Sequence, residues 1–192
     1  LNTVSWNTAG SWAYVGGDDG WLWRIRAQGD GGLETHLIEG RGEGDITGID
    51  CHNELMLCVI SSSIDGIGII DRDHVLTWIG GNFYPWTSVI CPTSYVHYCT
   101  SVSSDQQIGM IRLHSEGALQ SELSVSDIKG VNGKFTQLSH QEEARSLIIV
   151  APFSLLEHNI DTNSTYPWLD NEDAVNFDAT ISGERIIGTW NT

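Results

Sequence analysis

The chain has 192 residues, of which 40% are hydrophobic, and its 25 acidic residues exceed its nine Lys and Arg for a formal net charge of −16. The hydrophobic content is ordinary for a folded core and excludes a disordered acidic tail. The negative charge argues against direct nucleic-acid binding, which needs clustered Lys and Arg, and favours a basic partner. Twenty-one glycines and eight tryptophans, with few helix-like stretches, favour β structure.

Five segments of the chain repeat one pattern of strands and turns. They begin at Thr3, Thr47, Thr87, Thr136 and Ala174, in steps of 44, 40, 49 and 38 residues. Each unit is predicted to hold a short strand, an apolar strand, a tight polar turn and a third strand. A fourth strand is predicted at 33–39, 75–80, 118–125 and 165–169. The units occupy 1–43, 44–83, 84–131, 132–171 and 172–192, and the fifth is incomplete.

The second strand of each unit and the turn after it carry most of the signal. The runs 55–60 and 147–150 are continuously apolar, as expected where neighbouring layers cover both faces of a strand. Asp-Gly pairs at 19–20 and 65–66 mark tight turns, and Asp105 holds the same place without a glycine. A repeat of about 40 residues with four strands is typical of a propeller blade.

Three stretches lead into the predicted third strands: Gly16-Gly17-Asp18-Asp19-Gly20, Ser61-Ser62-Ser63-Ile64-Asp65-Gly66, and Ser103-Ser104-Asp105. On these residues the chain resembles the WD40-repeat β-propellers over nearly its whole length. The resemblance implies structural turn roles for Asp19, Asp65 and Asp105. No unit opens with the family's Gly-His pair or closes with its Trp-Asp dipeptide, so its buried Asp–His network is absent or rebuilt. Quinoprotein-like and sialidase-like propellers share the same blade.

The predicted fold is all-β, with about four and a half four-stranded antiparallel blades. A terminal half-blade exposes an unpaired strand edge, which a closed ring abolishes. WD40 propellers mostly close with about seven blades, so we expect this chain to be part of a larger ring. The missing blades would come from the same protein or from a partner chain, and a closed four-bladed ring is the alternative. The first residue, Leu1, indicates either processing or a piece of a longer chain.

The sequence predicts no catalytic residue, no metal site and no cofactor. It lacks the Gly-x-Ser-x-Gly and His-Glu-x-x-His motifs. The loop 40–45 is glycine-rich, but two acids and a following strand favour an interblade loop over a phosphate cradle. The four cysteines are too few for a disulfide scaffold and are expected to be free, structural thiols. A zinc site with His52 and His97 is the alternative, although the cysteine spacing is unlike a zinc knuckle.

Partner binding is predicted in two places. Residues 80–86 join the second unit to the third, on the top face in the WD40 layout, and their aromatic residues provide rigid contact area. The other place is the outer strand of the fourth unit with the acidic loop after it, which could receive a Lys or Arg. The alternatives are that Phe83 or Trp86 is core and that the acidic loop is simply solvated. The predicted partner-binding residues are Arg41, Phe83, Tyr84, Trp86, Trp168, Asp170 and Asp173.

Five further tryptophans and two arginines are predicted to have structural roles. Blade packing is predicted for Trp6, Trp12, Trp21, Trp23 and Trp78. Alternation along 21–26 places Leu22, Arg24 and Arg26 on one face of the strand and Trp21, Trp23 and Ile25 on the other. An ion pair of the arginines with acids of the outer strand, such as Glu34, is expected.

The predicted function is a non-catalytic scaffold that binds other proteins, with a basic peptide or a chain that completes the ring as partner. The resemblance implies an intracellular assembly component, in the nucleus or cytoplasm. No run is long and apolar enough to span a membrane, because the best one is broken by Pro152. No signal peptide is visible. The alternative is a secreted or periplasmic enzyme or lectin of the sialidase-like or quinoprotein-like type, glycosylated at Asn163.

Overall fold

The computed structural model describes residues 1–7, 9–29, 31–40, 42–52, 54–92, 97–128, 134–141, 146–151, 154–162, 164–170, 176–182 and 185–191. These residues form four four-stranded antiparallel sheets and one two-stranded sheet, and within each sheet the strands pair in chain order. The predicted all-β fold of four and a half blades is therefore confirmed. None of the helices in these ranges is long and apolar enough to cross a membrane.

The sheets are numbered here as blades 1 to 4 and a half-blade. Blade 1 contains β1 (Thr3–Trp6), β2 (Ala13–Gly16), β3 (Leu22–Ala27) and β4 (Leu33–Leu37). Blade 2 contains β5 (Ile46–His52), β6 (Leu57–Ser62), β7 (Ile67–Ile70) and β8 (Leu76–Gly80). Blade 3 contains β9 (Trp86–Ile90), β10 (Tyr98–Ser103), β11 (Gln107–Arg112) and β12 (Glu122–Asp127). Blade 4 contains β13 (Gln137–Gln141), β14 (Ser146–Ala151), β15 (Ser154–Asn159) and β16 (Ser164–Asp170), and the half-blade contains β17 (Asn176–Ser182) and β18 (Arg185–Asn191).

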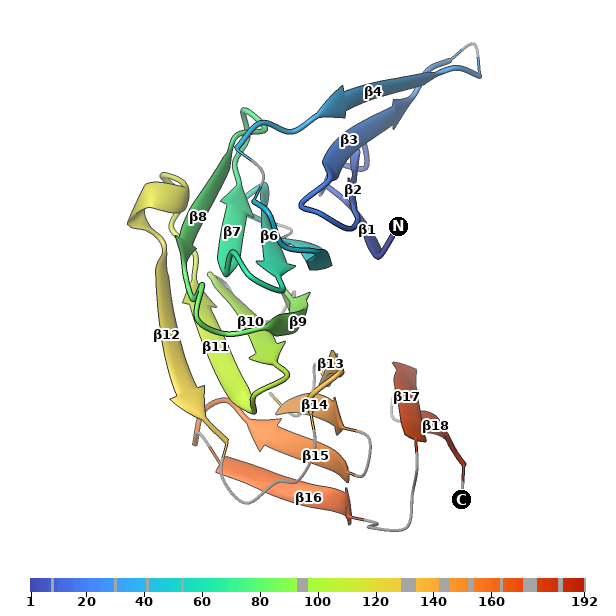
Figure 1. Ribbon diagram of the computed structural model, residues 1–192, viewed down its shortest axis with the longest axis vertical. Coiled ribbons are helices and arrows are strands. Elements are labelled where there is room, and N and C mark those ends of the chain that lie inside the picture. Colours follow the sequence, from blue (N-terminus) through green and yellow to red (C-terminus); the bar gives the residue numbers. More distant parts are fainter. Residues whose placement is uncertain are drawn as a thin grey trace.

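The blades stand side by side along an arc (Figure 1). The fourth strands β8, β12 and β16 lie on its convex side, and the arc is open on the side where both chain ends lie. The strand predicted at 118–125 is wrong at its start. Residues Ala118–Gln120 form a 3-10 turn instead, because Gly117 has a φ of 112° and the Ser121 hydroxyl donates to the Gly117 carbonyl. The strand β12 begins only after this turn.

The hydrophobic core lies between the blades. The cluster between blades 1 and 2 includes Tyr14, Leu22, Ile60 and Ile70. The cluster between blades 2 and 3 includes Val59, Ile69, Trp86 and Ile111. The cluster between blades 3 and 4 includes Val102, Ile108, Leu147 and Ile149. Successive residues of β6 thus belong to two different clusters, which explains why this strand is apolar on both faces.

Two disulfides correct the expectation of free thiols. Cys51 and Cys58 are opposite each other in the β5–β6 register and are bonded, and Cys91, just after β9, is bonded to Cys99 of β10. These bridges use all four cysteines of the chain, and a disulfide sulfur offers no thiolate to zinc. The sequence separations of 7 and 8 carry no recognisable motif, and only the hairpin register shows that the side chains meet.

One face of blade 1 has no neighbouring blade among the described residues. The strand register places Val4, Trp23 and Leu37 in one row across this face. Trp6 is 57% exposed, and the exposed Trp21 stacks on Trp23 with ring centroids 6.1 Å apart. The prediction that Trp6 and Trp21 pack between blades is therefore wrong for this part of the ring. Trp78, in contrast, packs against the core of blades 1 and 2.

Candidate interaction site

Three loops meet at one end of blades 1 and 2: residues 38–45 between β4 and β5, 63–66 between β6 and β7, and 81–85 between β8 and β9. Asp65 connects the first two loops. Its Oδ1 accepts a hydrogen bond from the Glu43 N–H (3.0 Å), and its Oδ2 accepts from the Gly44 N–H (2.8 Å) and from the Ser62 hydroxyl (2.8 Å). The glycine-rich loop is thus an anion cradle, and the anion it holds is the chain's own carboxylate.

The glycines of these loops are required by close backbone approach. A Cβ at Gly42 would lie 2.0 Å from the Asp65 carboxylate, and one at Gly44 would lie 2.7 Å from the Ile64 nitrogen. Gly66 has a φ of 98°, and its Cβ would lie 2.2 Å from the Gly80 carbonyl oxygen. Side chains at these positions would therefore force the three loops apart.

The hydrogen bonds also determine the charge of Asp65. Burial by itself raises the pKa of this carboxyl group. The hydrogen bonds from Glu43, Gly44 and Ser62 outweigh burial and hold the pKa below its usual value. Asp65 is therefore a firmly ionised carboxylate at neutral pH.

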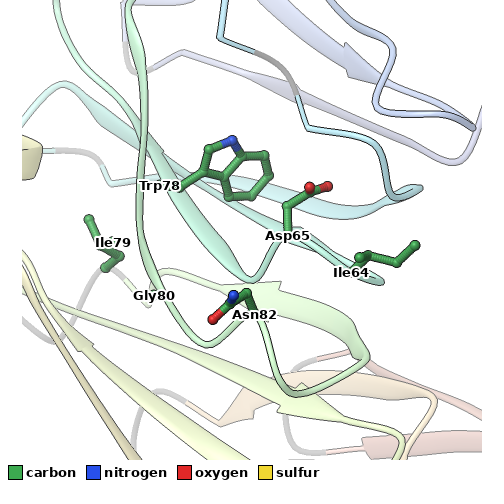
Figure 2. Close-up of a pocket in the computed structure, with 6 residues that line it drawn as sticks. All are labelled: Ile64, Asp65, Trp78, Ile79, Gly80 and Asn82. Atoms are coloured by element: carbon green, nitrogen blue, oxygen red, sulfur yellow. The ribbon is translucent and has the colours of Figure 1, made fainter.

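A pocket of about 510 Å³ opens beside Asp65. Figure 2 shows its lining residues, which are Ile64, Asp65, Trp78, Ile79, Gly80 and Asn82. The Trp78 indole N–H donates to the Gly40 carbonyl (3.1 Å), so this wall is fixed to the loop that holds Asp65. The pocket therefore combines a fixed aromatic wall with one carboxylate, and Ile64 is 59% exposed at its edge.

The predicted aromatic loop divides into an exposed part and a buried part. Phe83 is 87% exposed and follows the pocket residue Asn82. Tyr84 is half-buried and contacts Trp86 edge to face, with centroids 5.7 Å apart. Trp86 is fully buried, and its indole N–H donates to the Gly81 carbonyl (2.8 Å). The surface role predicted for Trp86 is corrected: this residue is core, and only Phe83 and part of Tyr84 are available to a partner.

Further carboxylates surround this end of blades 1 and 2. The side chains of Asp18, Asp19, Glu43 and Asp45 are exposed. The Asp45 carboxylate accepts a hydrogen bond from the Asp19 N–H (3.1 Å), so the β2–β3 turn and the β4–β5 loop are in direct contact. The acids of two blades therefore form one acidic surface around Asp65.

The other predicted residues lie apart from this surface or outside the described residues. Asp19 has a φ of 53°, and in the β10–β11 turn the Asp105 N–H donates to the Ser103 hydroxyl (3.2 Å) while Gln106 takes the left-handed conformation, with a φ of 67°. Arg41 and Asp173 lie outside the described residues. The backbone of Trp168 and Asp170 lies in β16 of blade 4, and their side chains are not described. Asp170 is opposite Ser154 in the strand register, so it belongs to β16 and not to the predicted acidic loop.

Sequence reasoning missed three contributors to this surface: Ile64, Asn82 and Asp45. Ile64 had a visible signal, because an apolar residue between Ser63 and Asp65 in a tight turn has no core to enter. Asn82 and Asp45 had none, since their roles depend on how three loops meet. Within the described residues, no group of three or more His, Cys, Asp or Glu is placed to hold a metal ion.

Comparison with known proteins agrees with this architecture. No family model matches the chain, and no curated protein matches it. Among solved structures, the chain is similar to the Myceliophteria thermophila Cps50 (Swd1) β-propeller domain, with a TM-score of 0.71 and 12% identity. The match covers 98% of this chain but 61% of that one. At this identity the similarity shows the fold alone, which is that of a β-propeller.

Proposed function

We propose that this WD40-like propeller region is a non-catalytic scaffold in a multiprotein assembly. It binds a basic peptide or a basic protein surface through the loops at the Asp65 end of blades 1 and 2. The observation that carries the proposal is the pocket in which an ionised Asp65 lies beside Trp78, with the exposed Ile64 in its lining and the exposed Phe83 one residue after the lining residue Asn82. The similarity to a solved propeller fits a scaffold role.

The chemistry of this surface suits a Lys or Arg side chain. The aliphatic stem of such a residue packs on apolar groups such as Ile64, while its charged head stays near water and near a carboxylate. The Trp78 ring adds an attractive face for a cation. The exposed acids around the pocket attract a basic partner from a distance, which raises the association rate more than the final affinity.

The test is the binding of a fluorescently labelled hexalysine peptide to the 192-residue chain. Phe83→Ala removes exposed apolar contact area and is expected to weaken binding about tenfold, or about 1.4 kcal/mol. Glu43→Gln removes one charge while the backbone N–H that holds Asp65 remains. It is expected to weaken binding a few-fold at low salt and less at high salt.

Each variant has a matched control elsewhere on the surface. Leu119→Ala truncates an apolar side chain that is 90% exposed in the 3-10 turn of blade 3. Glu54→Gln removes one exposed acid from the opposite end of blade 2. If the controls weaken binding as much as Phe83→Ala and Glu43→Gln, the peptide responds to net charge and exposed apolar area in general, and the proposed site is wrong.

A chain that completes the ring is a second proposed partner. The exposed face of blade 1 repeats the apolar alternation of the blade faces that are covered, and the chain spans about three-fifths of the solved propeller it matches. We propose that another blade, of the same protein or of a partner, covers this face. Light scattering on a sizing column tests this: a monodisperse 21.1 kDa monomer with a cooperative melt contradicts it, and association through open faces supports it.

The disulfides bear on where the protein folds. Cytosolic and nuclear thiols are kept reduced, so two bridges favour an oxidising compartment over the intracellular location implied by the resemblance. This supports the secreted setting of the second candidate function, a propeller enzyme or lectin. A melting temperature that rises with added sugars would support that candidate, and free-thiol counting on protein purified from its native source would test the compartment.

A further inference from the structure

A second unusual cluster lies at the opposite end of blades 1 and 2, and it gathers two arginines around one tryptophan. The strand register places Tyr14, Arg24 and His36 in one row across blade 1. Two residues further along β3, Arg26 is opposite Glu34. Trp12 lies just before β2, and the guanidinium carbons of Arg24 and Arg26 are each 4.8 Å from the centre of its ring. The chain has only nine Lys and Arg, so two around one indole are a local concentration of arginine.

Two imidazoles complete the surroundings of Trp12. The His36 ring centroid lies 5.8 Å from that of Trp12, and the His74 ring, from the β7–β8 turn of blade 2, lies at 5.5 Å. His74 is tied to blade 1 because its Nδ1 shares a 2.7 Å hydrogen bond with the Tyr14 hydroxyl. The cluster is therefore built from both blades and is fixed at their junction.

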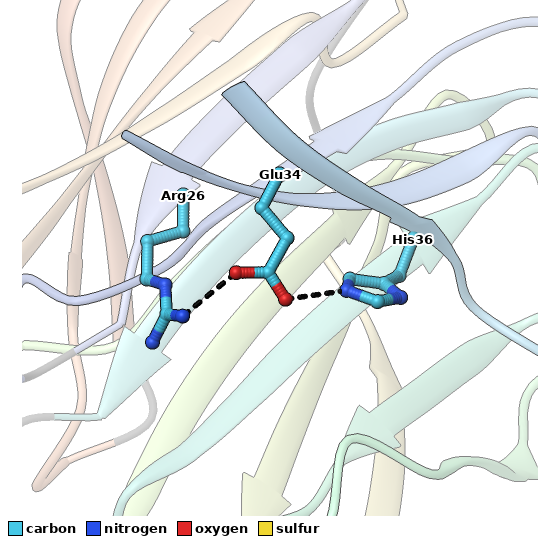
Figure 3. Close-up of polar contacts among 3 residues, drawn as sticks. All are labelled: Arg26, Glu34 and His36. Carbon is cyan, nitrogen blue, oxygen red and sulfur yellow. Dashed lines mark hydrogen bonds and ion pairs between the residues drawn. The ribbon is translucent and has the colours of Figure 1, made fainter. Parts of the chain in front are cut away.

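The two arginines differ in what they bind. An Arg26 Nη2 donates to Glu34 Oε2 (2.7 Å), and Glu34 Oε1 bonds His36 Nε2 (2.8 Å), as Figure 3 shows. Arg24 has no hydrogen-bond acceptor among the described residues, and its buried Nε is the atom left unsatisfied. A buried N–H without an acceptor destabilises a fold, and native structures rarely keep one. The Nε is buried and closed to an external ligand, whereas Arg24 as a whole is only partly buried. An external acceptor would therefore have to bind the Nη groups of the guanidinium.

The packing that holds Arg24 leaves it no acceptor. Its guanidinium lies against the Trp12 ring, and the Tyr14 hydroxyl, whose residue is opposite Arg24 in the strand register, forms its hydrogen bond with His74 instead. A planar guanidinium fixed against an aromatic ring loses little freedom when it binds a second, planar partner. The site is thus arranged for an acceptor that the chain itself does not supply within its described residues.

We propose that this cluster binds a carboxylate of an acidic protein segment, with the Arg24 guanidinium as the main donor. In the Arg26–Glu34–His36 group, a carboxylate of the chain itself already binds an arginine and a histidine, which are the side-chain types that surround Trp12. A singly charged carboxylate suits the site better than a doubly charged phosphate, because Glu34, Asp71 and Asp73 lie nearby and the net charge is −16. This site lies at the other end of the blades from the Asp65 pocket and is independent of the function proposed there.

The experiment uses a hexaglutamate peptide as probe and two-dimensional NMR of the Arg24 Nε–H and the Trp12 indole N–H. Saturating peptide is expected to shift both signals, because a carboxylate bound at the guanidinium changes the surroundings of its buried Nε–H and of the Trp12 indole N–H. Arg24→Met keeps the apolar stem, removes the unsatisfied donor and is expected to lower affinity at least tenfold while the melting temperature stays equal or rises. Arg24→Lys keeps the charge without the planar fork and is expected to lose at least threefold.

Arg112→Gln is the matched control, because Arg112 is an exposed arginine on β11 of blade 3. It is expected to change affinity less than twofold. The proposal is overturned if the Arg24 Nε–H does not shift, if Arg24→Met binds like the wild type, or if Arg112→Gln loses as much as Arg24→Met. Inorganic phosphate at equal concentration is the competing probe, and tighter binding of phosphate than of hexaglutamate would overturn the assignment to a carboxylate.

Discussion

Blade 2 takes part in two junctions, one with blade 3 and one with blade 1, and the polar groups of these junctions differ in how they are bonded. At the first, the Thr47 hydroxyl donates to the Trp86 carbonyl (2.9 Å) and the Asp50 carboxylate accepts from the Cys91 N–H (2.7 Å). The Cys91–Cys99 disulfide belongs to the core of this junction, whereas the Cys51–Cys58 disulfide belongs to the core between blades 1 and 2. The second junction is apolar around Leu22. Near its other end the guanidinium of Arg24 lies over Trp12 and has no acceptor among the described residues.

The difference separates structural polar groups from groups available for binding. Asp50 is polar and partly buried, but its two carboxylate oxygens accept from the backbone N–H groups of Cys51 and Cys91, so it joins the blades. Arg24 is also polar and its Nε is buried, but within the described residues it forms no hydrogen bond that would connect the blades. A satisfied polar group contributes to stability, whereas an unsatisfied one costs stability and is retained where it serves another purpose.

The largest effect is expected at Trp86 in the junction of blades 2 and 3. Trp86→Ala removes a fully buried side chain and should lower the free energy of unfolding by about 3–5 kcal/mol. Phe83→Ala, three residues away but exposed, should change it by less than about 0.5 kcal/mol. Denaturant unfolding measures both variants. Equal losses would mean that the loop packs as one unit and that Phe83 is not free to bind.

The disulfides are expected to have the next largest effect, and one of them belongs to the core of each junction. The Cys51→Ala, Cys58→Ala double variant should lose about 2 kcal/mol, because the bridge closes a short loop in the unfolded chain. The same double change at Cys91 and Cys99 should lose a similar amount. Thermal melts with and without a reducing agent provide the check. A wild-type melting temperature unchanged by complete reduction would contradict a stabilising role for the bridges.

Asp50→Ala tests the polar contact across the junction of blades 2 and 3. The change leaves the Cys91 N–H without its acceptor and should cost about 1–2 kcal/mol of unfolding free energy. Burial raises the pKa of Asp50, although hydrogen bonds from Cys91 and Cys51 oppose that rise. Asp50→Asn keeps one acceptor oxygen and should lose less than Asp50→Ala. If the Asn variant loses as much, the negative charge rather than the hydrogen bond holds the blades together.

The blades could be predicted from sequence because their signals are local. The apolar run 55–60 and the Asp65-Gly66 turn identify a hairpin without knowledge of its neighbours. The shared face of Arg24 and Arg26 and the Arg26–Glu34 ion pair were also predicted correctly, since alternation along one strand determines them. The ion pair expected for Arg24 is not formed within the described residues. The disulfides were missed because Cys51 meets Cys58 only through the register of two strands.

The sites were harder to predict because they join several loops. Asp65 was assigned to a turn, but its cradle needs the Glu43 and Gly44 N–H groups of another blade. Trp86 looked like a surface aromatic because the loop sequence does not show which ring turns inward. The Trp12 cluster depends on a histidine 62 positions further along the chain, and no local pattern connects them.

The smallest expected effect concerns the pH dependence of the junction between blades 1 and 2, through His74. Burial, and then the positive charges of Arg24 and His36, lower its pKa, while Asp71 and Asp73 oppose them. The unfolded chain therefore binds more protons than the folded chain near and below pH 6.5, the ordinary value. The stability that neutral His74 provides is present above pH 6.5 and is lost as the pH falls through that value.

His74→Gln should flatten this dependence in thermal melts between pH 5 and pH 8. The comparison is made between the variant and the wild type, because burial also lowers the pKa of His158 in blade 4 and adds a slope of the same sign. A carboxylate bound beside Arg24 would favour protonated His74, so hexaglutamate should bind the wild type more tightly at pH 6 than at pH 8. This preference should be smaller for His74→Gln, which keeps His36 in the same cluster. If the wild type and the variant bind hexaglutamate with the same pH dependence, His74 does not belong to the binding site around Arg24. If their melting temperatures also change with pH in the same way, neutral His74 does not stabilise this junction.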